Sequence, residues 1–403
     1  MGQVHSTGPS LRSGFAWTVA GNAINGFSQW AILSIIAKLS TSEILGQYAL
    51  ATAVAVPVAM LAHLNLRSVL ATDVLGRHPF SDYFAVRLAA GLAGLAVITG
   101  IGILWDPFWP VGAAIVLAGA AMTVENFEDL YYGVMQRDDR LDRVAKSMIL
   151  RAGLSMFCVG AFITASRSAA AAAAGLFTGR IVTLLVFDLR NGKSPAAMRE
   201  APRGVFRAAL PLGLVLMLVS LTAMIPRYVI ERELGTAMLG AFAAVASFVT
   251  VGSTIINALG QTAITRLARV HANGQERLFR HLALRLTGLA LAIGLTGVAV
   301  AILGGDFFLR VLYRPEYADY QWLLTEMLMA GTFGYIAVIL GFAVTSTRRF
   351  DVQLPLQFVV AITSGLASLI AIPRFGLSGA ALALGAAAFV QIAGQLIILR
   401  KAL

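Results

Sequence analysis

The chain has 403 residues, of which 58% are hydrophobic and only 13% are charged. Soluble domains carry about 25% charged residues, so this composition excludes a soluble globular protein. The formal net charge of +11 would suit an acidic partner such as nucleic acid or acidic lipid, unless the topology of a membrane protein accounts for it. The apolar residues lie in runs of roughly 20, the length of a membrane-spanning helix, and do not alternate with polar residues as in a β-barrel. The sequence therefore predicts an all-α polytopic membrane protein.

The apolar runs predict twelve transmembrane helices, six in each half of the chain. An even number of spans places both termini on the same side of the membrane. The expected helices cover residues 13–36, 45–66, 82–104, 109–134, 145–165, 168–189, 205–229, 237–261, 281–304, 321–343, 353–372 and 378–399.

Lys and Arg in the loops predict which side is cytoplasmic, because these residues resist translocation. One set of alternating loops and helix ends is rich in them, around residues 137–151, 190–207 and 266–285, whereas the opposite set carries few. Both termini are therefore predicted to be cytoplasmic. This asymmetry explains most of the positive charge without a nucleic-acid partner.

A basic stretch containing Pro and Gly interrupts the apolar sequence near its middle. The expected domains are an N-terminal six-helix lobe (1–189), a cytoplasmic basic linker (190–204) and a C-terminal six-helix lobe (205–403). The halves also repeat a short motif: Leu45-Gly46-Gln47-Tyr48-Ala49 opens the second helix, and Leu239-Gly240-Ala241-Phe242-Ala243 opens the eighth. With six spans per half, the two halves share one orientation, an arrangement typical of transporters whose substrate sites lie between the halves.

Polar residues inside the predicted spans are costly in a membrane and therefore informative. Asn22, Asn25 and Gln29 share one face of the first helix, and Asn257 and Gln261 share a face of the eighth. Such residues either line a cavity or hold the bundle together by interhelical hydrogen bonds. The sequence leaves both interpretations open.

Arg180 is the most informative single residue. It lies about nine residues from the cytoplasmic end of the sixth predicted helix, roughly 13 Å deep at 1.5 Å per residue. Its expected acidic partners are Glu125, Glu128 and Asp129 on the fourth helix. One interpretation is a buried ion pair that stabilises the N-terminal lobe; the other is a planar donor group that binds a phosphate.

The sequence contains no nucleophile–His–acid set, no phosphate-binding loop and no histidine spacing typical of a metal site. The loops expected outside the membrane are too short for a catalytic domain. We therefore expect a protein that is not an enzyme and that has no metal and no cofactor.

Several motifs resemble one known family. In the second half these are Ile225-Pro226-Arg227-Tyr228-Val229-Ile230-Glu231, Ala258-Leu259-Gly260-Gln261, Arg266-Leu267-Ala268 and Arg314-Pro315-Glu316-Tyr317-Ala318, and in the first half Leu66-Arg67-Ser68. In order and spacing they resemble the polysaccharide and oligosaccharide flippases, of the O-antigen type, in the multidrug/oligosaccharidyl-lipid/polysaccharide (MOP) exporter superfamily.

The resemblance implies a 6 + 6 helical transporter of a bacterial inner membrane that works by alternating access. It would move polyprenyl-diphosphate-linked oligosaccharide from the cytoplasmic to the outer leaflet, for synthesis of lipopolysaccharide O-antigen or exopolysaccharide. Membrane lipids, and other membrane proteins of polysaccharide assembly, would be its partners, and a monomer is expected.

This substrate assigns roles to the polar residues. The diphosphate would bind Arg180, Arg87 and Arg151, and the sugars would meet Asn22, Asn25, Gln29, Asn257 and Gln261. Ion coupling would fall to Glu125, Glu128, Asp129 and Glu326.

Three other functions stay open. One is a lipid II flippase of the same superfamily, although such proteins usually have extra C-terminal helices. A cation-coupled drug or toxin antiporter of the same superfamily would favour an acid in the first helix, where this chain has Asn22 and Asn25 instead. Glu326 and the Glu125 cluster keep that alternative open. A membrane enzyme of polysaccharide assembly would need a larger catalytic loop than the sequence provides.

Overall fold

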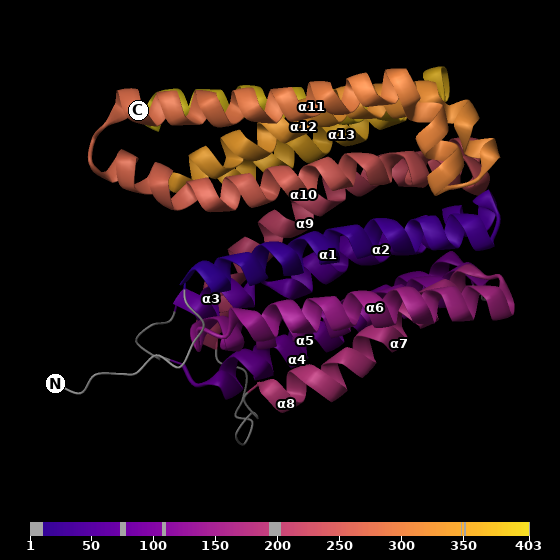
Figure 1. Ribbon diagram of the computed structural model, residues 1–403, viewed down its shortest axis with the longest axis horizontal. Helices are drawn as coiled ribbons and strands as arrows, with labels where there is room; N and C mark the ends of the chain where they lie inside the picture. The colour runs from indigo at the N-terminus through magenta and orange to yellow at the C-terminus, as the bar shows by residue number, and fades with distance from the viewer. Residues whose placement is uncertain are drawn as a thin grey trace. The chain divides into compact units, whose positions relative to one another are not determined.

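The computed structural model describes residues 11–72, 78–106, 110–192, 203–347, 349 and 352–402. Within these ranges the chain is helical and contains no strand (Figure 1). Most of the expected linker, residues 193–202, lies outside the described residues.

The helices of the first half follow the predicted spans closely. Their bounds are α1 (Leu11–Leu39), α2 (Ser42–His63), α3 (Leu66–Thr72), α4 (Phe80–Trp105), α5 (Pro110–Arg137), α6 (Leu141–Ser166), α7 (Ala169–Thr183), the π-helical turn η1 (Leu184–Asp188) and α8 (Leu189–Asn191). The sixth predicted span thus consists of three consecutive segments, α7, η1 and α8.

The second half contains longer helices. Their bounds are α9 (Arg203–Leu234), α10 (Thr236–Ala272), α11 (Glu276–Leu312), the 3₁₀ turn η2 (Pro315–Tyr320), α12 (Gln321–Ser346), α13 (Gln353–Phe375) and α14 (Leu377–Ala402). One predicted bound differs here: the span expected to end at residue 304 is longer in the structure. The helix continues through a kink at Gly304 to Leu312, and η2 follows directly.

Eleven helices of the described chain are long and apolar enough to cross a membrane. The first helix, α1, is not among them, because Asn22, Asn25 and Gln29 lower its mean hydropathy. Together with α1 these helices make up the twelve that the sequence predicted. The chain is a multi-pass, all-α membrane protein.

The chain forms two compact units. Unit 1 contains Met1–Ile32 and Val58–Leu214, and unit 2 contains Leu33–Pro57 and Val215–Leu403. The helices α1, α2 and α9 therefore contribute residues to both units. The six-helix lobes expected from the sequence stay a prediction, and the two units are described separately below.

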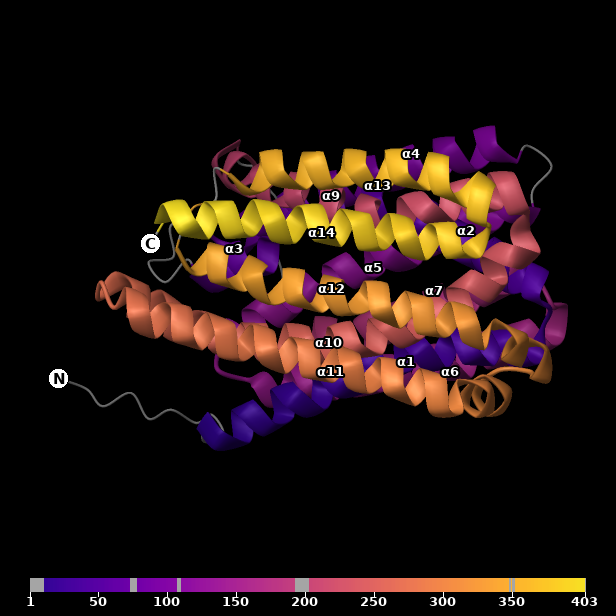
Figure 2. The ribbon, with the colours of Figure 1, turned by 90° about the horizontal axis from the view of Figure 1, so that it is seen from above.

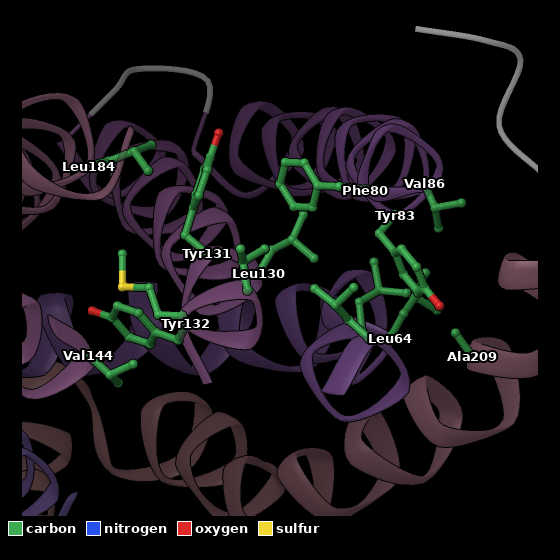
Figure 3. Packing of buried hydrophobic residues seen from close by; sticks show 14 of the residues in the cluster. Leu64, Phe80, Tyr83, Val86, Leu130, Tyr131, Tyr132, Val144, Leu184 and Ala209 are labelled. Atoms are coloured by element: carbon green, nitrogen blue, oxygen red, sulfur yellow. The ribbon is translucent and has the colours of Figure 1, made fainter. Parts of the chain in front are cut away.

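In unit 1, α5 packs against α4 and α7, and α7 packs against α6. An apolar cluster surrounds the C-terminal part of α5. Figure 3 shows Phe80, Tyr131 and Tyr132 in this cluster, with the rings of Phe80 and Tyr131 5.7 Å apart. This packing holds the last turns of α5 in place, and the carboxylates of the candidate site lie on the turns before them.

In unit 2, α12 packs against α10, α11 and α14, and α13 packs against α14 (Figure 2). The repeated motif has a structural role in this unit. A Cβ on Gly46 would overlap the carbonyl oxygen of Thr236, and a Cβ on Gly240 would overlap that of Ser42. Gly46 and Gly240 hold equivalent places in the motif, and Ser42 and Thr236 each lie four residues before the glycine. The starts of α2 and α10 therefore pack through two matching backbone contacts that require glycine.

Candidate functional site

The carboxylates of α5 form the centre of a buried polar cluster in unit 1. Glu125, Glu128 and Asp129 are spaced at i, i+3 and i+4, so they project from one side of the helix. The fraction of the side chain exposed falls from 29% at Glu125 to 0% at Glu128. A buried carboxylate is stable in a membrane protein only with a cation or hydrogen-bond donors beside it.

Arg151 on α6 provides such donors. Its Nη1 lies 3.1 Å from Oε2 of Glu128 and 3.3 Å from Oε1 of Glu125. Its Nη2 donates a hydrogen bond to Oδ1 of Asn25 on α1. The Arg151 side chain is only 7% exposed, so this guanidinium joins α1, α5 and α6 inside unit 1.

Arg180 on α7 provides the second cation. Its Nη2 lies 2.9 Å from Oε2 of Glu125, and its Nη1 is buried with no hydrogen-bond partner in the described part of the chain. Glu125 therefore bridges two guanidinium groups. The partner predicted for Arg180 is confirmed, but only Glu125 of the three carboxylates pairs with it in the described structure.

Asp129 has other partners. Its Oδ2 lies 3.0 Å from Nε2 of His63, and its Oδ1 lies 3.2 Å from Nη1 of Arg67. The sequence indicated Arg67 only as part of a family motif and assigned no role to His63. Both residues lie at the junction of α2 and α3, so Asp129 joins that junction to α5.

Arg87 is fully buried, and its contacts indicate a structural role. Its Nη1 donates hydrogen bonds to the carbonyl oxygens of Ala62 (3.1 Å) and His63 (2.8 Å). These are the last carbonyls of α2, which have no partner within the helix, and a basic side chain commonly caps such a C-terminus. The predicted contact of Arg87 with a headgroup gains no support from these partners.

Asp188 is a buried carboxylate that the sequence analysis did not select. It ends η1, is 0% exposed, and both of its carboxylate oxygens lack a hydrogen-bond partner among the described residues. It lies within electrostatic range of Glu128 and Arg151. Two signals could have identified it: it is the only acid in the sixth predicted span, and it lies in a π-helical turn, a feature frequent at functional sites.

The polar face of α1 contributes unequally to the cluster. Asn25 contacts Arg151, whereas Asn22 is half-buried and Gln29 is exposed. In the structure, Asn25 therefore joins helices to one another, as the hydrogen-bonding interpretation predicted. No contact tests the predicted sugar-binding role of Asn22 or Gln29.

Unit 2 contains the remaining predicted residues. Asn257 lines a cavity, and its Nδ2 donates to the carbonyl oxygen of Ser253 at 2.8 Å. Gln261 is exposed. Glu326 lines a separate apolar cavity of about 540 Å³ next to α14, and its Oε2 is buried without a hydrogen-bond partner in the described chain.

No protein-family model matches the chain. Among curated proteins it is similar to the capsular polysaccharide biosynthesis protein CapF of Staphylococcus aureus, with 22% identity over 395 residues, 94% of this chain and 96% of that protein. It is also similar in structure to a multidrug resistance MATE family transporter of the MOP superfamily, with a TM-score of 0.67 and 14% identity, over 99% of this chain and 96% of that one. The lipid II flippase MurJ aligns with a TM-score of 0.75 and 10% identity, over 95% of this chain and 87% of that one.

The chain has the fold of the MOP superfamily. The fold that the resemblance implied is therefore confirmed. The structural similarity to the MATE family transporter extends over nearly the whole of both chains, so the MOP fold describes both halves of the sequence and not one segment of it.

Proposed function

We propose that this MOP-fold protein is a transporter that flips polyprenyl-diphosphate-linked oligosaccharide from the cytoplasmic to the outer leaflet of a bacterial inner membrane. It would serve the synthesis of a cell-surface polysaccharide, with both termini in the cytoplasm, as a monomer and without enzymatic activity. The similarity to a capsular polysaccharide biosynthesis protein supports this choice of substrate.

The observation that carries the proposal is the bridge from Glu125 to Arg151 and Arg180. Two guanidinium groups lie within helices of membrane-spanning length, and each is held by a carboxylate. A diphosphate is the kind of anion that such planar donor groups bind in pairs.

The bridge also suggests how the headgroup enters. An unpaired charge in a membrane is costly, so a free cationic pocket would be unstable. If a phosphate oxygen replaces Glu125 at Arg180, one ion pair is exchanged for another. Glu125 stays paired with Arg151, and the unpartnered Nη1 of Arg180 becomes a further donor to the phosphate.

Arg180→Ala tests this proposal in a strain that lacks the gene. We expect that strain to accumulate lipid-linked saccharide protected from a membrane-impermeant lectin, and the wild-type gene to restore access. Arg180→Ala is expected to lower flipping at least tenfold while lowering the amount of protein in the membrane much less. Arg280→Ala is a matched control, because Arg280 is 61% exposed and pairs with Glu276 on its own helix.

An equal loss of flipping and of protein amount would leave Arg180 with a structural role alone. A normal distribution of lipid-linked saccharide in the deleted strain would refute the flippase. Either result would be distinguished from poor expression by quantifying the protein in the same membranes.

Glu326 favours a second function, export of a hydrophobic cation. Its carboxylate lies on the wall of an apolar cavity, a combination suited to a drug-like cation. New sensitivity of the deleted strain to cationic dyes, restored by the wild-type gene but not by Glu326→Gln, would support the antiporter over the flippase.

A further inference from the structure

Unit 2 contains an open cavity of about 300 Å³, and the polar side chains among its described lining residues are amides and one hydroxyl. Its walls come from α9, α10, α12, α13 and α14. The polar side chains that line it are Asn257, Thr345, Gln353, Gln357, Gln391 and Gln395, and none of the described residues that line it is charged.

Gln395 indicates that the cavity is suited to a ligand. The residue is 3% exposed, and its Oε1 is buried with no hydrogen-bond partner in the described part of the chain. A buried acceptor without a donor is unfavourable, so a group that donates to it would stabilise the cavity. Gln391 lies one turn earlier on α14 and therefore on the same face.

The other walls support the same conclusion. Gln357 on α13 is 9% exposed, and Nε2 of Gln353 donates to Oγ1 of Thr345 at 3.1 Å, so the amide groups extend across two neighbouring helices. Phe342 contributes an apolar wall. Gly341 keeps the space open, since a Cβ there would lie 3.2 Å from Nε2 of Gln395.

We propose that this amide cavity binds the sugar of the lipid-linked substrate. The inference rests on the proposed flippase function and deepens it by assigning the saccharide to residues of unit 2. Carboxamides both donate and accept hydrogen bonds, as sugar hydroxyl and acetamido groups do. Phe342 offers an apolar surface to the carbon–hydrogen face of a sugar ring.

The neutral lining favours the sugar over the diphosphate. The described residues on the walls of the cavity include no cation to pair with a phosphate. Its volume lies at the lower end of the range for small-molecule pockets, about 300–1,000 Å³. The sugar is thus the part of the substrate that suits this cavity.

A binding experiment with two lipids separates these assignments. The probes are the lipid-linked saccharide that accumulates in the gene-deleted strain, and the same polyprenyl diphosphate without sugar. Both are titrated into the full chain in nanodiscs. We expect the wild-type chain to bind the sugar-bearing lipid at least tenfold more tightly than the sugar-free lipid.

Gln395→Leu is expected to remove most of this tenfold preference without changing the affinity for the sugar-free lipid. Gln391→Leu, at a less buried position on the same wall, is expected to act in the same way and serves if the first variant does not fold. Gln275→Leu is the matched control, because Gln275 is an exposed residue of the turn before α11. It is expected to keep the full preference.

The outcomes distinguish the two proposals. A wild-type chain that binds neither lipid would refute the flippase and, with it, the saccharide as occupant of the cavity. Equal binding of both lipids by the wild-type chain, or a preference that survives both Leu variants, would refute the amide cavity while leaving the flippase intact.

Discussion

The two units bury polar groups of different kinds. In unit 1 the buried polar residues include the charged side chains of Arg87, Glu128, Arg151, Arg180 and Asp188. Among the described residues of unit 2, the polar residues in the same class of burial are all neutral, Gln357 and Gln395 among them. Among the described residues, the charged side chains in this class of burial therefore all lie in unit 1, whereas unit 2 buries neutral polar groups.

This difference predicts different tolerance to substitution. A buried charge that loses its partner is far more costly than a neutral amide that is replaced by an apolar group of similar size. The variants below test that contrast by thermal unfolding of the purified protein in detergent, beginning with the largest expected effect.

Arg151→Ala is expected to destabilise the protein by about 3–5 kcal/mol, because it leaves Glu128 buried without its cation. The paired variant Arg151→Met with Glu128→Met removes both charges and is expected to recover most of the loss. A paired variant as unstable as Arg151→Ala would show that volume, and not charge, decides the stability of this cluster.

Gly240→Ala is expected to cost about 1–3 kcal/mol or more, because its Cβ would overlap the Ser42 carbonyl oxygen. Gly334→Ala is the control, since a Cβ at Gly334 on α12 has no atom within 4 Å. In unit 2, substitution of this glycine is therefore limited by close backbone packing, whereas in unit 1 substitution is limited by buried charges. Equal unfolding midpoints for the two variants would contradict the close approach of α2 and α10.

Asp188→Asn is expected to stabilise the protein by about 1 kcal/mol, because a buried carboxylate with no close hydrogen bond among the described residues, and with Glu128 nearby, is costlier than a neutral amide. Asp142→Asn is the comparison variant, and its expected change in stability has the opposite sign. Asp142 accepts from Arg140 and lies 3.6 Å from Nζ of Lys146, so its variant is expected to lose a few tenths of a kcal/mol. A large loss of stability in Asp188→Asn would mean that the carboxylate has a partner that stabilises the fold.

Gln395→Met is expected to have the smallest effect, within about 1 kcal/mol of the wild type, because it replaces an amide whose acceptor is unpaired. Stability should be retained while the preference for the sugar-bearing lipid is lost. A loss as large as that of Arg151→Ala would mean that unit 2 depends on its amides as strongly as unit 1 depends on its charges.

Much of the fold follows from local sequence. The described helices coincide with the predicted spans because each apolar run is long enough to cross a bilayer, and that length is a property of the chain alone. The sequence also predicted that Arg180 pairs with an acid of the fourth helix, because Glu125 lies near the same depth as Arg180.

The errors and omissions concern which way each helix faces. Spacing placed Glu125, Glu128 and Asp129 on one side of α5 but did not show that Asp129 meets His63 while Glu125 meets two arginines. The contacts of Arg87 Nη1 with the last carbonyls of α2 were not foreseen, and its predicted role at a headgroup stays a prediction. These contacts depend on how each helix is rotated about its axis. The sequence does not determine this rotation, because a membrane helix carries apolar residues on several sides.

By itself, the sequence determined the membrane-spanning class, the number and approximate limits of the helices, and the resemblance to the MOP superfamily, because hydropathy and motif order are properties of the linear chain. Tertiary structure decided which charges pair, that Asp188 is buried without a partner among the described residues, and that glutamines of α13 and α14 line one cavity. Each of these contacts joins residues that are far apart in the chain, so it depends on how the helices pack against one another.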